Sequence, residues 1–250
     1  MQIITNEPLV QRNRKIATFL FFFSLIVLGA GFIVANGQIF GLNLEEDETG
    51  ASAYLVFMPI VLLVGFISTM ISVRMTNLWV RLPRPEESLK VNLKGLSHKS
   101  RLYNYYHSPA RHVLVSPHGI FVIVTRFQDG KFSVSGDKWK TKRSVFGRLF
   151  SFFRMDDLGD PTREAKQAAE HIGSIVEGYD PELNVQPLIL FIGVKVDLNI
   201  DNPTVPVLYA DSKLQPNIKD YLRDIQKAKT MNGPEDIDDF VEAFEEATFE

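Results

Sequence analysis

The stretch HVLVSPHGIFVIVTR (residues 112–126) contains two apolar runs that are separated by Pro117, His118 and Gly119. Val, Ile and Phe favour strands and the Pro-His-Gly break favours a turn, so the stretch predicts a β-hairpin. Neither run alternates between apolar and polar residues, which is typical of strands that are covered on both faces. A second turn, at residues 128–130, predicts that residues 131–135 add a third strand to form a meander.

Two long apolar segments precede this hairpin in the chain of 250 residues. Residues 16–35 and residues 53–73 contain no charged side chain. At 1.5 Å per residue, each is long enough to cross a hydrocarbon core about 30 Å thick. We therefore expect a transmembrane hairpin of two helices. Buried core helices are the alternative for both segments, and a signal peptide is a further alternative for the first.

The charges that flank these segments predict their orientation. Arg12, Arg14 and Lys15 precede the first segment, and three arginines follow the second by residue 84. The connecting loop has four acids and no Lys or Arg. The positive-inside rule then places both termini in the cytoplasm, with the protein in the inner (plasma) membrane. The chain has no cysteine, which excludes disulfides and thiolate metal sites.

The remainder of the chain predicts one α+β domain. Strands are expected at residues 185–194 and 204–210, and a helix is expected at residues 212–228. Strands followed by helices are typical of a single α+β core. The expected divisions are a cytoplasmic tail (1–15), the hairpin (16–73), a basic juxtamembrane linker (74–94), the domain (95–228) and an acidic tail (229–250).

A helix start is predicted within this domain. Asp160 suits the N-cap position, Pro161 suits the first helical position, and Glu164 suits the positive end of the helix dipole. Apolar residues then recur at helical spacing to about residue 177.

Residues 95–225 resemble the nuclease-related domain (NERD) family, a relative of the restriction-endonuclease-like fold. The resemblance is carried by the apolar hairpin, its Pro-His-Gly turn, the following Asp-Gly turn and the Asp-Pro helix start, in this order and spacing. It implies a mixed sheet flanked by helices and a phosphodiesterase ancestry. It also implies an N-terminal membrane anchor of a kind found on some family members.

The residues that a nuclease would need are missing from the matching positions. The family's acid-any-Lys triplet would fall on Val124, Thr125 and Arg126, and its upstream acid near Arg111 or His112. A Mg²⁺ ion requires anionic oxygen ligands, which Val and Arg cannot supply. We therefore expect no catalytic residue, no metal and no cofactor, and a domain that serves as a binding or scaffolding module.

Two other functions stay open at this point. An active Mg²⁺-dependent nuclease would have to use displaced acids such as Asp129, Asp137 or Glu170, although both aspartates stand in turns beside glycine. A structural membrane protein that only self-associates is the other alternative.

Three histidines, His107, His112 and His118, lie close together in the sequence. A transition-metal site would add a carboxylate or another fixed ligand, but no acid lies between Lys90 and Gln128. We expect structural or solvent-facing histidines.

A basic stretch with aromatic residues follows the predicted meander. A helix that begins near Arg143 would either face the core or carry basic residues that bind an anionic partner. Its expected partners are anionic lipid head groups of the bilayer or nucleic acid. The candidate binding residues are Lys138, Trp139, Lys140, Lys142, Arg143, Arg148 and Arg154.

The last seventeen residues contain eight acids and no base. Ile237, Phe240, Val241 and Phe244 stand at helical spacing, which predicts an amphipathic helix docked on its own domain. Alternatively, the acids cover the basic stretch or bind another protein. If they cover it, deletion of residues 233–250 would strengthen binding to lipid or nucleic acid.

Overall fold

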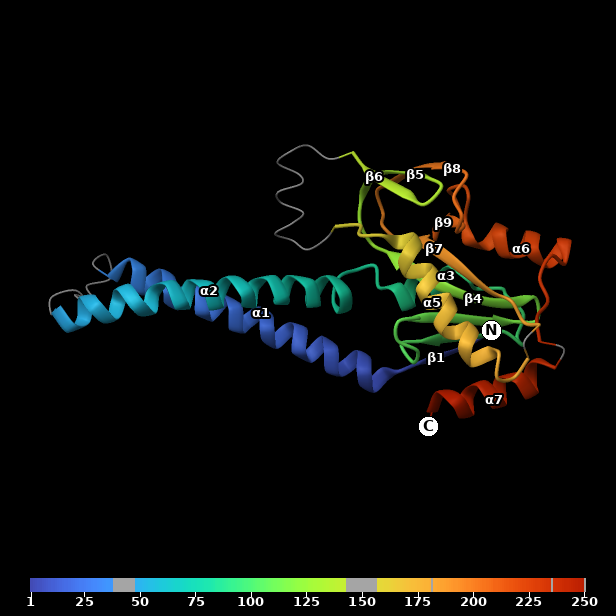
Figure 1. Cartoon of the computed structure of the whole chain (residues 1–250), viewed down its shortest axis with the longest axis horizontal. Helices are drawn as coiled ribbons and strands as arrows, with labels where there is room; N and C mark the ends of the chain where they lie inside the picture. The colour runs from blue at the N-terminus through green and yellow to red at the C-terminus, as the bar shows by residue number, and fades with distance from the viewer. Residues whose placement is uncertain (38–47, 143–156, 181, 235, 250) are drawn as a thin grey trace. The chain divides into compact units, whose positions relative to one another are not determined.

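The structure is a computed structural model that describes residues 1–37, 48–142, 157–180, 182–234 and 236–249 (Figure 1). Its contacts divide the chain into two compact units. The helical unit contains Pro8–Leu82, and the globular unit contains Met1–Glu7 together with the described parts of Pro83–Val145 and Leu158–Glu250.

The helical unit is an antiparallel pair formed by α1 (Glu7–Ala35) and α2 (Glu48–Trp79). Arg14 Nε donates a hydrogen bond to the Trp79 carbonyl at 3.2 Å. Farther along α1, a Cβ on Gly65 of α2 would lie 3.1 Å from Leu28 Cδ2. Residues later in α1 therefore meet residues earlier in α2, as in a hairpin.

Small residues line the contact between these helices. Residues spaced seven apart are buried on each helix, as is typical of helices that pack along a shared seam. Without a Cβ, Gly31 and Gly65 allow the backbones to approach closely. The buried residues in this spacing are Val10, Ala17, Ser24 and Gly31 on α1 and Met58, Gly65 and Ser72 on α2, and Ser68 of α2 is buried as well.

The outer faces of α1 and α2 are apolar. Phe19 is 67 % exposed, Ile26 is 68 % exposed and Leu63 is 59 % exposed. A continuous exposed apolar surface of this kind suits lipid better than water. Both helices are long and apolar enough to cross a membrane, in agreement with the two predicted segments.

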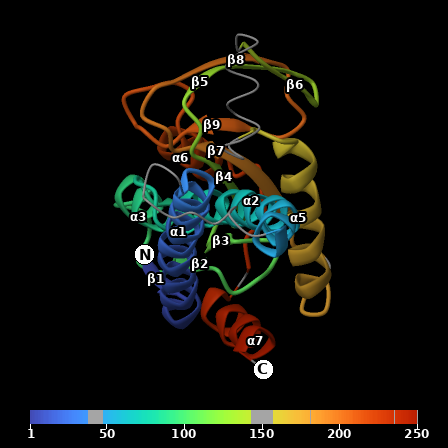
Figure 2. The same ribbon diagram turned by 90° about the vertical axis from the view of Figure 1, so that its left-hand side faces the viewer.

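The globular unit is built on a six-stranded mixed sheet (Figures 1 and 2). The predicted hairpin is confirmed as β3 and β4, with Val113 opposite Val122. Strand β2 pairs antiparallel with β3, whereas β1, β7 and β9 join parallel to their neighbours. In spatial order the strands are β1 (Gln2–Thr5), β2 (Arg101–Asn104), β3 (His112–Ser116), β4 (Gly119–Arg126), β7 (Val185–Phe191) and β9 (Val207–Tyr209).

The predicted meander is wrong in its third strand. Strand β5 (Gly130–Ser135) leaves the central sheet and forms a separate three-stranded sheet with β6 (Lys138–Thr141) and β8 (Val196–Asp201). Its inner side chains, including Phe132 and Val134, pack in a cluster with Phe191. Since β5 and β8 follow the carboxyl ends of β4 and β7, the small sheet extends the unit beyond that edge.

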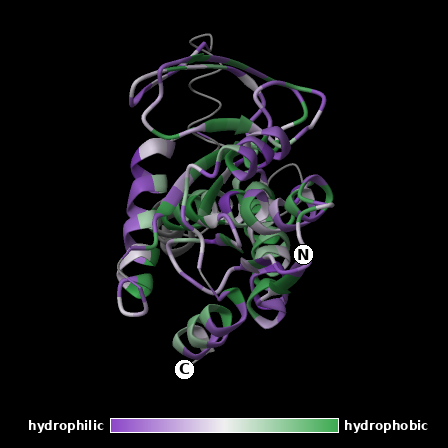
Figure 3. Cartoon of the chain, turned by 90° about the vertical axis from the view of Figure 1, so that its right-hand side faces the viewer, coloured by the Kyte–Doolittle hydropathy of each residue, from purple (hydrophilic) through white to green (hydrophobic). Residues whose placement is uncertain are grey.

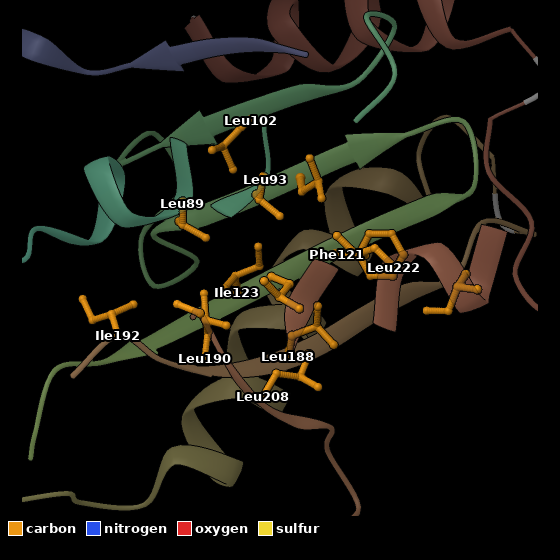
Figure 4. Packing of buried hydrophobic residues seen from close by; sticks show 14 residues of the cluster. Leu89, Leu93, Leu102, Phe121, Ile123, Leu188, Leu190, Ile192, Leu208 and Leu222 are labelled. Carbon is orange, nitrogen blue, oxygen red and sulfur yellow. The ribbon is translucent and has the colours of Figure 1, made fainter. Parts of the chain in front are cut away.

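Helices cover both faces of the central sheet. Helices α3 (Pro85–Asn92) and α6 (Ile218–Ala228) pack on one face, where Figure 4 shows Leu89 and Leu93 beside Leu102 and Ile123. Helices α5 (Pro161–Val176) and α7 (Ile237–Phe249) pack on the other face. Figure 3 shows hydrophobic residues concentrated on the sheet and hydrophilic residues on the outer side of α5.

Two of the expected divisions differ from the structure. Residues 1–15 are not a tail, because Gln2–Thr5 form an edge strand and α1 begins at Glu7. Residues 74–94 are not only a linker, because α2 continues to Trp79 and α3 places Leu89 and Leu93 in the core. The charges of these segments predict a tail and a linker, whereas their short apolar faces pack on the globular unit.

The acidic tail is docked on its own domain, as predicted. Ile237, Phe240, Val241 and Phe244 of α7 are buried against β2, β3 and α5. Deletion of residues 233–250 would therefore expose this cluster, so the deletion cannot isolate an effect of the acids.

Phe240→Ala should destabilise the globular unit by about 3–5 kcal/mol, because the side chain is 1 % exposed and its removal leaves a cavity. Asp239→Ala, on the exposed side of the same helix, is the control and should change stability by less than about 0.5 kcal/mol. Urea unfolding of the full chain in detergent measures both. Equal effects of the two changes would contradict this packing of α7.

Candidate functional site

The candidate site lies at the carboxyl end of β4. Side chains of a strand alternate between its two faces, so Val122, Val124 and Arg126 share one face. Val122 packs against α5 residues, and Val124 lies between that cluster and the cluster of the small sheet. An aliphatic side chain held in apolar contacts therefore occupies the position where the resemblance implies a metal ligand.

Arg126 is a buried cation at the end of the same row. Its side chain is 10 % exposed, and its Nη2 lies 2.9 Å from Glu164 Oε2. Nη1 donates a hydrogen bond to the Thr125 carbonyl at 3.1 Å. The Nη2 contact is an ion pair without the alignment of a hydrogen bond, and Nε has no hydrogen-bond partner in the described chain. A permanently charged guanidinium thus stands where the resemblance implies a Lys.

Glu164 is positioned by the start of α5. The predicted N-cap is confirmed, since Asp160 Oδ1 accepts a hydrogen bond from the Arg163 amide at 3.0 Å and Pro161 begins the helix. Glu164 therefore lies in the first turn, where the helix dipole favours a carboxylate. It is 52 % exposed and reaches Arg126, so the ion pair joins the start of α5 to the end of β4.

Arg111 and His112 stand at the start of β3. Pairing of β3 with β4 begins with Val113 opposite Val122, so both residues precede the paired positions. Arg111 is exposed, and its carbonyl accepts a hydrogen bond from the Tyr105 amide. Alternation along β3 puts His112 on the α3 face, away from the face of Val113.

His112 belongs instead to a buried polar chain that reaches the N-terminal strand. Its Nδ1 lies 2.8 Å from Asn104 Oδ1, and Asn104 Nδ2 donates to Thr5 Oγ1 at 3.1 Å. Burial, followed by the nearby charge of Arg111, lowers the pKa of His112 to about 3. Nδ1 is therefore the donor of a neutral imidazole, and Nε2 has no partner in the described chain.

The other two histidines lie at different places in the globular unit. His107 Nε2 lies 3.0 Å from the Thr248 hydroxyl, and its ring contacts Phe244 of α7. Burial, with a smaller contribution from His171, lowers the pKa of His107 to about 4. His118 is half-buried in the β3–β4 turn, where its amide donates to Ser116 Oγ.

The displaced acids do not converge. Asp129 Oδ1 accepts the Lys195 amide at 2.9 Å, and Asp137 pairs with Lys166 at 2.8 Å and also accepts the Thr204 hydroxyl. Glu170 is on the exposed side of α5. Among the residues that the structure describes, no group of three His, Asp or Glu could hold a metal ion.

The candidate binding residues on β6 lie on two different faces of the small sheet. Lys138 and Lys140 are exposed on the outer face of the small sheet, and Lys142 is exposed just beyond the strand. Trp139 turns inward, where its Nε1 donates to Thr162 Oγ1 at 2.8 Å and its ring lies 5.9 Å from Phe191. Trp139 is thus unsuited to stacking on a bound base. Arg143, Arg148 and Arg154, with the helix expected there, lie outside the described residues.

The link from His112 to Thr5 is the part of this region that was not predicted from the sequence. No local pattern marks Thr5, because its partner lies 99 residues away. A short apolar and β-branched run, QIIT, is the one signal that could have been used.

Comparison of the chain with family models, with curated proteins and with solved structures found no match.

Acid should destabilise the globular unit through His107 and His112. Both have a folded pKa below the unfolded value of about 6.5, so the unfolded chain takes up protons first as the pH falls. Stability should decline by up to about 1.4 kcal/mol per pH unit for each histidine below pH 6.5. The loss for His107 is complete near its pKa of about 4, and that for His112 near about 3.

Urea unfolding of the full chain in detergent, followed by Trp139 fluorescence in a Trp79→Phe background, measures this slope. His112→Asn keeps a donor to Asn104 but cannot titrate, so its slope should be shallower whatever its stability at neutral pH. An unchanged slope would show that His112 contributes nothing to the acid sensitivity.

Proposed function

We propose that this protein is a membrane-anchored, non-catalytic relative of nuclease-related domains that acts as a binding or scaffolding module. The observation that carries this proposal is the Arg126–Glu164 ion pair beside the apolar Val124. A buried cation at this point repels a divalent ion electrostatically. Its carboxylate partner is also already neutralised, so it is a poor metal ligand.

The strand arrangement supports the nuclease-related ancestry. A mixed sheet flanked by helices is what the resemblance implies, and the globular unit has α3 and α6 on one face and α5 and α7 on the other. The hairpin β3–β4 that carries the degenerate positions is in the middle of that sheet. The small sheet is an addition that the resemblance does not imply.

The pairing of β1 with β2 supports two membrane crossings. Strand β1 precedes α1 and β2 follows α2, yet Gln2 pairs with Arg101 and Thr5 pairs with Asn104. Strands of one sheet are on the same side of a membrane, so the helices between them must cross it an even number of times. With the basic flanks, this favours a two-span protein with both termini in the cytoplasm, at the inner membrane.

The exposed lysines of β6 support an anionic partner for the module. In the described part of the chain, Lys138, Lys140 and Lys142 have no ion pair, whereas Lys131 on the neighbouring strand pairs with Asp197 at 3.2 Å. The partner classes that fit these charges are anionic lipid and nucleic acid. A protein partner or self-association would be detected by crosslinking in membranes.

The purified full chain should not cleave plasmid DNA with Mg²⁺ or Mn²⁺, because the described residues contain no cluster of carboxylates that could bind either ion. Asp129→Asn, Asp137→Asn and Glu170→Gln are the controls for displaced acids. The proposal of a non-catalytic domain would be overturned if the wild type cleaved DNA, if a chelator stopped this cleavage and if any of these changes abolished it. Such cleavage would instead establish the nuclease alternative.

The variants Gln2→Cys and Lys227→Cys should be labelled in the same way by a membrane-impermeant maleimide. Native cysteines do not interfere, since the chain has none. In intact cells neither position should react, and after lysis both should react. A cysteine in the acidic loop, at Asn43, is the control and should react in intact cells. Labelling of residue 2 but not of residue 227 in intact cells, or the reverse, would exclude the hairpin.

A further inference from the structure

Helix α3 has one face in the core and one face in solvent. Leu89 and Leu93 are almost completely buried, and Figure 4 shows both pointing into the core beside the sheet. On the other face, Val91 is 69 % exposed and Lys90 is exposed. An exposed Val beside a Lys on a short helix is not explained by the packing of the globular unit.

Lys94 extends this exposed face. Its amide donates to the Val91 carbonyl at 3.4 Å, so the helical turn continues past Asn92. Lys90 and Lys94 are four residues apart and therefore lie on one side of the turn. In the described chain neither lysine has an ion pair. We call Lys90, Val91 and Lys94 the α3 patch.

The acids of α3 already have partners. Glu87 pairs with Arg84 at 2.7 Å, and Glu86 accepts the hydroxyl of Tyr105 at 2.8 Å. Both are in the first turn, where the helix dipole also stabilises them, and Lys90 is in the last turn, where the dipole favours a cation. Neither Lys90 nor Lys94 forms an ion pair with an acid among the described residues.

We propose that the α3 patch contacts anionic phospholipid head groups of the membrane that anchors the chain. This inference rests on the proposed membrane anchoring. Helix α3 begins six residues after Trp79, the last residue of α2, so the sequence keeps it near the end of an apolar helix. Lysines can bind phosphate while Val91 enters the boundary between head groups and acyl chains. The patch has no aromatic or arginine side chain for contacts with nucleic acid bases.

Proximity to lipid can be measured because the chain has no cysteine of its own. Val91→Cys is labelled with bimane, and the full chain is reconstituted in nanodiscs that contain a spin-labelled lipid. Gln167→Cys, exposed on α5 at the opposite face of the sheet, is the matched reporter. In discs that contain phosphatidylglycerol, the label at residue 91 should be quenched and the label at residue 167 should not.

Charge reversal tests whether the lysines produce this contact. Each basic residue that reaches an anionic surface strengthens binding by about fivefold. Lys90→Glu with Lys94→Glu should therefore reduce quenching at residue 91 to the level of residue 167. The neutral pair Lys90→Gln with Lys94→Gln should give an intermediate loss without adding acids beside Glu86. Lys213→Glu with Lys227→Glu makes the same change in net charge elsewhere and should leave the quenching unchanged.

Three outcomes would overturn the inference: no quenching at residue 91 beyond that at residue 167, equal quenching in phosphatidylcholine alone, or an equal loss with the control pair. Co-migration of the protein with the discs reports the membrane anchoring independently. A chain that is incorporated but unquenched would refute the lipid contact alone, and a chain that is not incorporated would refute the anchoring on which it rests.

Discussion

The pairing of β1 with β2 is the constraint on which the architecture depends. Four residues at the N-terminus join a sheet whose other strands begin about a hundred residues later. Both ends of the α1–α2 pair must therefore return to one sheet. The helices between β1 and β2 can form a hairpin, but they cannot cross a membrane an odd number of times. Strands that are this far apart in the sequence are also expected to pair late in folding, because the chain between them loses conformational entropy before the contacts form.

The ion pair at the end of β4 joins two elements of the globular unit. Arg126, the last residue of β4, attracts Glu164 in the first turn of α5. Burial of the guanidinium has a desolvation cost that a single, half-exposed carboxylate offsets only in part. The pair is thus better understood as a device that positions α5 than as a source of stability. A Lys would be a weaker substitute, because Arg126 also bonds the Thr125 carbonyl through a second nitrogen.

Local signals account for the parts of the fold that the sequence predicts. The two apolar helices, the β3–β4 hairpin and the α5 cap each depend on residues within one segment, and all were found. The predicted pairing of β5 was wrong because a meander is only the shortest connection, whereas Phe132 of β5 packs against Phe191 in the cluster of the small sheet. Strands β1, β2 and β6 have four residues each, too few for a periodic pattern to appear. Strand β8 was not predicted, although its exposure alternates, because Asp and Asn are disfavoured in strands.

The sequence does not show on which face of the sheet each candidate residue lies. Arg111 and His112 are adjacent in the chain, and alternation puts neighbouring side chains of a strand on opposite faces. Val124 and Arg126 share one face of β4, whereas His112 is on the other face of the sheet and is linked to Thr5 through Asn104. The β3–β4 hairpin therefore carries a charged pair on one side and the link to the N-terminal strand on the other. Both features therefore depend on the backbone of the same buried hairpin.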